Sequence, residues 1–69
     1  MMLEEYRIEC GWSKAQMARH ADIDINTLNR ALEGEVVAAG TANKIARAIS
    51  KELGRTIRAR DIEGLNTKL

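Results

Sequence analysis

Apolar residues recur at intervals of three and four along most of the chain, the spacing that places side chains on one face of an α-helix. The clearest set runs from Ala42 to Leu53 and is followed by Gly54. Shorter sets come before it, and a few more apolar residues follow it. The pattern predicts helices over residues 2–10, 14–21, 25 to 32 or 33, from between 38 and 41 to 53, and a short one around 59–63 before frayed final residues.

Residues with known capping preferences stand between these predicted helices. Gly11 is suited to end the first helix in a left-handed conformation. Ser13 and Gln16 have the spacing of a capping box at the start of the second helix, and Asp24 is a good N-cap for the third. Asp22 falls in the turn, where aspartate tolerates a left-handed backbone better than most residues. The second and third helices are therefore joined by a turn of three residues.

Several residues outside the main helical pattern have an expected place in a small core. Val36 and Val37 follow the third helix, and we expect both to pack down onto the core. Trp12 is expected to anchor the junction between the first two helices. Cys10 is interpreted as a small buried apolar residue, and His20 as a surface residue. None of these five is assigned a chemical role.

The length and composition indicate one small all-α domain over residues 1–69, with four to five helices. The chain has 69 residues, no proline and no phenylalanine. One cysteine and one histidine cannot build a tetrahedral metal site, and no set of acid, base and nucleophile suggests catalysis. We therefore expect no enzymatic activity, metal or cofactor. No stretch approaches the roughly 20 apolar residues of a membrane span, so we expect a soluble cytoplasmic protein.

Charge is distributed unevenly although the formal net charge is only +1. Residues 1–12 and 33–43 are both acidic, whereas residues 44–60 contain six basic residues and one acidic residue. A nearly neutral chain can therefore carry a basic face. The arginines Arg55, Arg58 and Arg60 belong to this part; they either form a solvated face or bind a partner or phosphate.

The two helices over residues 14–21 and 25–32 fit a helix-turn-helix, in which the second helix presents its N-terminal half to the major groove of DNA. Ala18 supplies the small residue that a close helix crossing needs. Asparagine can bind adenine, arginine can bind guanine, and threonine can contact a phosphate or a thymine methyl group. At the start of the preceding helix, Lys14 can hold a phosphate. The second helix offers these polar side chains: Asn26, Thr27, Asn29 and Arg30.

The chain resembles the Xre/phage-repressor family of helix-turn-helix proteins, to which Cro-like regulators belong. The resemblance runs from Tyr6 to about Ile62 and rests on an ordered set of segments: YR at 6–7, GWSKAQMA at 11–18, IDINTLNRALEG at 23–34 and TANKIARAI at 41–49. It implies a lambda-repressor-like fold. It also implies DNA-facing residues at Lys14, Ile25, Asn26, Asn29 and Arg30, with Thr27 on the phosphate side.

Three positions depart from the family pattern. Asp22 stands where the family often has glycine, and Leu32-Glu33-Gly34 replaces the usual Glu-Asn-Gly end of the recognition helix. Arg7 therefore loses its usual glutamate partner unless Glu33 takes over. The loop after Gly34 is acidic rather than basic because it begins with Glu35, and this removes expected phosphate contacts.

These observations predict a sequence-specific regulator of transcription, repressor-like, that binds double-stranded DNA. We expect a homodimer on an inverted repeat, with half-sites about 34–36 Å apart. The C-terminal segment 55–69, with Ile57, Ile62 and Leu65, is the expected dimer contact or a surface for a protein partner. The alternative is a protein-interaction module of the same fold, such as an antitoxin, an anti-repressor or an adaptor.

Overall fold

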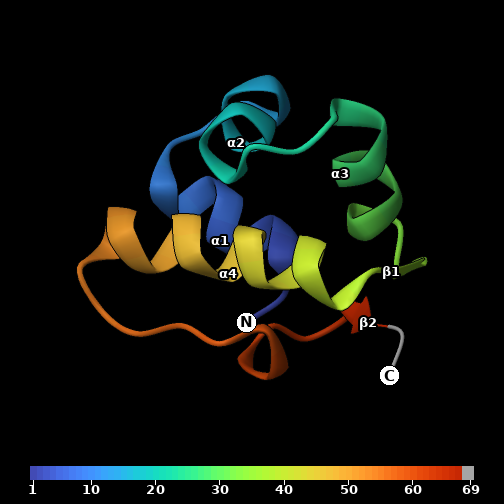
Figure 1. Cartoon of the computed structure of the whole chain (residues 1–69). Coiled ribbons are helices and arrows are strands. Elements are labelled where there is room, and N and C mark those ends of the chain that lie inside the picture. Colours follow the sequence, from blue (N-terminus) through green and yellow to red (C-terminus); the bar gives the residue numbers. More distant parts are fainter. Residues whose placement is uncertain (68–69) are drawn as a thin grey trace.

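The computed structural model describes residues 1–67 and shows four α-helices with a short C-terminal extension (Figure 1). The four predicted helices are confirmed, and their bounds agree with the expected ones to within one residue. The predicted all-α class is confirmed for the main body of the chain. The elements are α1 (Leu3–Cys10), α2 (Lys14–Ala21), α3 (Ile25–Leu32), β1 (Val36–Val37), α4 (Ala39–Leu53), the 3₁₀ turn η1 (Ala59–Asp61) and β2 (Asn66–Thr67).

The caps form as the sequence predicts. Ser13 Oγ accepts a hydrogen bond from Gln16 N at 3.1 Å, while Gln16 Oε1 accepts one from Ser13 N at 2.8 Å. Asp22 ends α2 with φ 57° and is the one residue other than glycine with a positive φ in the described chain. Asp24 Oδ2 accepts from Asn26 N at 3.1 Å. These bonds satisfy backbone donors that a helix start leaves without an intrahelical acceptor.

The core is built around α4, which contacts both α1 and α2. Its buried side consists of residues that the apolar spacing predicted, and Ile45 and Ile49 are completely buried. Trp12 is buried at the α1–α2 junction, as expected, whereas Cys10 is only half-buried. The exposed His20 ring stacks on Trp12 with 4.5 Å between ring centroids. The largest completely buried side chains are Met17, Leu28, Ile45 and Ile49.

The C-terminal extension differs from the predicted short helix. Only a 3₁₀ turn of three residues forms at 59–61, and the chain then becomes extended. Asn66 and Thr67 pair in parallel with Val36 and Val37, so these residues are ordered by a partner strand rather than frayed. Val37 is buried, but Val36 is 56% exposed, which corrects the prediction that both pack on the core. Pairing distant segments is a tertiary event that helical periodicity cannot indicate.

The hydroxyl group of Ser50 helps to hold the start of this extension against α4. Ser50 Oγ accepts a hydrogen bond from Ile57 N at 2.8 Å, and its own proton can be donated to Ile57 O at 2.9 Å or to Ala46 O at 2.8 Å. Ile57 and Ile62 are buried in the chain's own core, at 9% and 2% exposed. These two isoleucines therefore leave little apolar surface for the dimer contact expected of segment 55–69, which stays a prediction; Leu65 is partly buried, and residues 68–69 lie outside the described part.

The elements divide the molecule into two sides (Figure 1). The α2–α3 pair lies on one side of α4, and the segment that follows α4 runs along the other side before returning to β1. Within residues 1–67 no helix has both the length and the apolar character needed to cross a membrane.

Candidate nucleic-acid interface

The turn between α2 and α3 is held by its own backbone. Ile23 N donates to Ala18 O at 3.0 Å, and the left-handed Asp22 reverses the chain direction after α2. Asp24 then begins α3 as an N-cap. A carboxylate in this place interacts favourably with the positive end of the helix dipole. The two aspartates therefore serve the turn and the cap of the helix-turn-helix.

α3 has one buried side and one exposed side. Leu28 and Ala31 are buried against the core. Asn26 and Arg30 are exposed, Asn29 and Thr27 are half-buried, and Ile25 is 40% exposed. The predicted DNA-facing residues of α3 therefore lie outside the core. We define the recognition face as the accessible predicted residues of α2 and α3: Lys14, Ile25, Asn26, Thr27, Asn29 and Arg30.

A cleft between the start of α2 and the second half of α3 brings two predicted residues together. Lys14 and Asn29 both line this cleft, which has a volume of about 510 Å³. Glu4, Leu32 and Glu33 complete its lining. The other four residues of the recognition face do not line it. Lys14 therefore lies in a cleft beside α3 that is also lined by two carboxylates, which the sequence analysis did not assign to this site.

Arg7 on α1 fixes the position of Glu4, which lines this cleft. Its guanidinium donates to both carboxylate oxygens of Glu4, at 2.6 and 2.7 Å, and to Trp12 O at 2.7 Å. Glu4, not Glu33, is thus the partner of Arg7. The hydrogen bonds from Arg7 lower the pKa of Glu4 below its ordinary value, with a smaller opposing effect of burial. The charged form of Glu4 is therefore favoured next to Lys14.

Arg30 has a carboxylate partner of its own. Its Nε lies 3.5 Å from Glu35 Oε1, and both side chains are more than half exposed. This glutamate belongs to the acidic loop that follows Gly34. An exposed pair of this kind is weak, generally below about 1 kcal/mol. Glu35 can thus hold Arg30 in the free protein and release it to a ligand.

The family comparison agrees with this geometry. A family model described as helix-turn-helix matches residues 3–57, which include all four helices. The chain belongs to this Xre/Cro-like helix-turn-helix family, as the resemblance predicted, and the family is a DNA-binding one. No curated protein and no solved structure matches the chain significantly.

Proposed function

We propose that this protein is a sequence-specific, repressor-like regulator of transcription that inserts α3 into the major groove. The observation that supports this most directly is the exposed side of α3. It presents Asn26, Asn29 and Arg30 from one short helix whose opposite side is fixed in the core by Leu28 and Ala31. A rigid helix that exposes amide and guanidinium groups on one side is suited to reading base edges.

Each residue of the recognition face has a role in this proposal. Asn26 and Asn29 suit adenine and Arg30 suits guanine, because each can form two hydrogen bonds with the base edge. Ile25 offers an exposed apolar surface to a thymine methyl group. Lys14 and Thr27 contact phosphates on either side and so position α3 without adding sequence preference.

A homodimer on an inverted repeat is part of the proposal. A single domain with few phosphate contacts binds DNA weakly, and joining two recognition helices multiplies the affinity. Because Ile57 and Ile62 are internal, we expect the dimer to be weak in solution and to form mainly on DNA. Sedimentation of the free protein and of its complex with a selected duplex measures this difference.

The experiment that tests the main proposal combines site selection with substitution. Duplexes selected from a random library give the preferred site, and fluorescence anisotropy gives affinities at several salt concentrations. Asn29→Ala and Arg30→Ala should each weaken binding to the selected site by about 1–3 kcal/mol and relax preference at one base pair. Asn43→Ala and Arg19→Ala are matched controls on exposed positions of α4 and α2. Absence of salt-dependent DNA binding would refute the proposal.

A second candidate function follows from the carboxylates around the recognition face. Glu4 and Glu33 line the cleft with Lys14, and Glu35 pairs with Arg30. Such a face is less favourable to phosphate than a purely basic one, and it favours the alternative of a protein-interaction module, such as an antitoxin, an anti-repressor or an adaptor. In that case Arg30→Ala would leave DNA affinity unchanged at low salt.

A further inference from the structure

A second surface lies along α4 and the C-terminal extension. Here a groove of about 760 Å³ runs between the two segments. It shares no residue with the recognition face. The groove is lined from α4 by Asn43, Ala46, Arg47 and Ser50, and from the extension by Thr56, Ile57, Arg58, Ala59, Arg60, Leu65 and Thr67. We call this surface the basic groove.

The basic groove has arginines at its sides and apolar atoms beneath them. Arg47, Arg58 and Arg60 are exposed, whereas Ala46 and Ile57 are buried in its floor. Among residues 1–67, none of the three arginines has a carboxylate oxygen within 4.0 Å, the limit at which the other ion pairs occur. Three arginines thus line one groove without an intramolecular counter-charge in the described chain.

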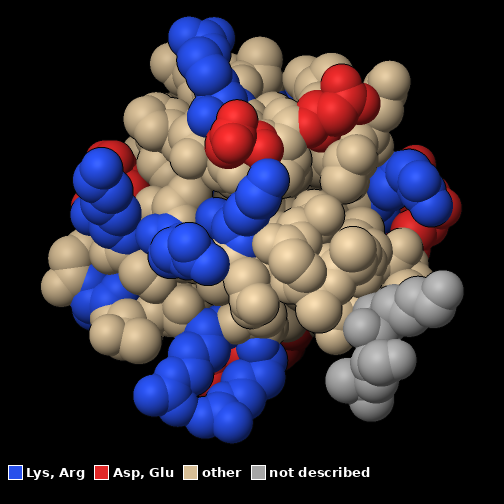
Figure 2. Space-filling view, viewed as in Figure 1, with Lys and Arg blue, Asp and Glu red and all other residues tan. Residues whose placement is uncertain are grey.

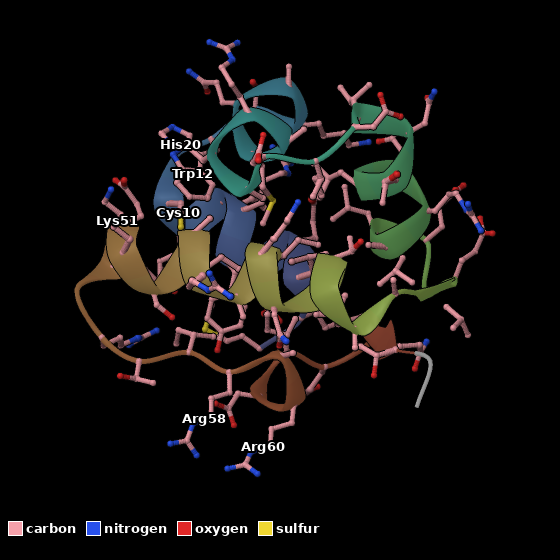
Figure 3. All side chains as sticks on the ribbon, in the orientation of Figure 1. Cys10, Trp12, His20, Lys51, Arg58 and Arg60 are labelled. Atoms are coloured by element: carbon pink, nitrogen blue, oxygen red, sulfur yellow. The ribbon has the colours of Figure 1, made fainter. Side chains whose placement is uncertain are left out.

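The figures show how these cations are displayed. Arg58 and Arg60 project side by side from the turn at η1, with their guanidinium groups away from the ribbon (Figure 3). Basic side chains gather over the same face of the molecule (Figure 2). The nearest acidic neighbour in sequence, Asp61, accepts a hydrogen bond from the backbone of Arg58 at 3.0 Å.

The basic groove and the recognition face lie on different sides of α4. α4 lies between the α2–α3 pair and the extension (Figure 1). A duplex that receives α3 in its major groove therefore has no need of Arg58 or Arg60. The arginines of the groove are free to bind a different anion while the recognition face is occupied.

The chemistry of the groove selects among possible anions. A symmetric dimer through this face would set the same arginines of two copies against each other, so a second copy is disfavoured. Single-stranded nucleic acid is disfavoured because the floor is aliphatic and the lining contains no aromatic residue on which a base could stack. A polypeptide can supply both carboxylates for the sides and an aliphatic side chain for the floor.

We propose that the basic groove binds an extended acidic segment of a partner protein, with carboxylates on Arg47, Arg58 and Arg60 and an aliphatic side chain over Ala46 and Ile57. This interaction does not depend on the recognition face. The protein can therefore hold a partner and DNA at the same time, on two sides of α4.

A short fluorescein-labelled peptide of glutamates around a central leucine is the probe. We expect the full chain to bind it, with anisotropy that falls as salt increases and amide shifts confined to residues 43–50 and 56–67. The double variant Arg58→Gln, Arg60→Gln should bind about tenfold more weakly, because exposed ion pairs contribute up to about fivefold each. Arg19→Gln, an exposed arginine on α2, should bind as the unaltered protein does.

Three results would overturn the proposal. The first is equal affinity of the double variant and the unaltered protein for the peptide. The second is equal binding of a matched peptide in which glutamine replaces glutamate, since charge would then contribute nothing. The third is a loss of duplex affinity in the double variant that exceeds its loss of peptide affinity, which would make the groove a nucleic-acid contact. DNA affinities of the Asn29→Ala and Arg30→Ala variants test the recognition face separately.

Discussion

The recognition face and the basic groove use cations in opposite ways. At the recognition face every cation has acidic neighbours: Glu35 pairs with Arg30, and two glutamates share a cleft with Lys14. In the groove, three arginines have no carboxylate within 4.0 Å among the described residues. The first surface is suited to selective hydrogen bonding with limited general attraction to phosphate. The second is suited to attracting an anion. A chain with a net charge of +1 therefore has one surface with paired cations and one surface with arginines that are unpaired within residues 1–67.

The largest expected effect comes from a core substitution that destabilises the whole domain and so impairs both surfaces. Leu28 is completely buried, so Leu28→Ala should lower the free energy of unfolding by about 2–5 kcal/mol. Urea titration followed by Trp12 fluorescence measures the loss. In a domain of this size, that loss is expected to reduce DNA and peptide binding together. Ile8→Ala is the matched control, because Ile8 is 65% exposed and its removal should change stability little.

A smaller effect should separate the two surfaces. Ser50→Ala removes the hydroxyl that binds Ile57 N and O, and leaving these groups without a partner costs about 1–3 kcal/mol. We expect faster amide exchange at Ile57 and weaker peptide binding in the basic groove. Affinity for the selected duplex, measured at a temperature where the variant remains folded, should stay unchanged. Unchanged exchange at Ile57 would show that Ser50 does not anchor the extension.

Removing the carboxylate beside Arg30 should sharpen the contrast between the surfaces. Glu35→Gln frees Arg30 and removes a charge that repels phosphate, so DNA affinity should rise by up to about fivefold. The increase should shrink at high salt. Glu52→Gln on α4 makes the same charge change away from the recognition face. An equal increase in that control would assign the effect to net charge alone.

Asp24 allows a similar comparison without loss of the cap. Asparagine caps a helix about as well as aspartate, so Asp24→Asn should leave the thermal midpoint nearly unchanged while removing one negative charge at the start of α3. We expect a modest gain in affinity for unrelated duplexes and therefore a smaller ratio of specific to non-specific binding. An unaltered ratio would contradict the view that Asp24 limits non-specific binding.

The smallest expected effect concerns pH. The Arg7 hydrogen bonds lower the pKa of Glu4 below its ordinary value of 4.5 in the folded protein. Between the two values the unfolded chain binds more protons, so this contribution to stability is present above about pH 4.5 and is lost as the pH falls through the folded-state pKa. Because Glu4 is exposed, the change is small. Urea titrations of Glu4→Gln and the unaltered protein should differ near neutrality and converge in acid.

The helical part of the fold could be predicted from the sequence because its causes are local. Apolar spacing located all four helices, and Ser13, Asp22 and Asp24 marked boundaries through their own hydrogen bonds or backbone preference. The exposed side of α3 followed from the same periodicity, since burying Leu28 and Ala31 turns Asn26 and Arg30 outward. The role of these side chains toward DNA stays a prediction.

Only the tertiary structure decided what depends on residues distant in sequence. Ser50 gave no sign that it would hold Ile57, and the pairing of β1 with β2 joins segments about thirty residues apart. The partners of Arg7 and Arg30 among several nearby glutamates were also set by packing, because an ion pair depends on where helix ends meet. The sequence by itself determined the four helices and the polar side of α3. Folding determined which carboxylates lie next to the recognition face, and it formed the basic groove on the other side of α4.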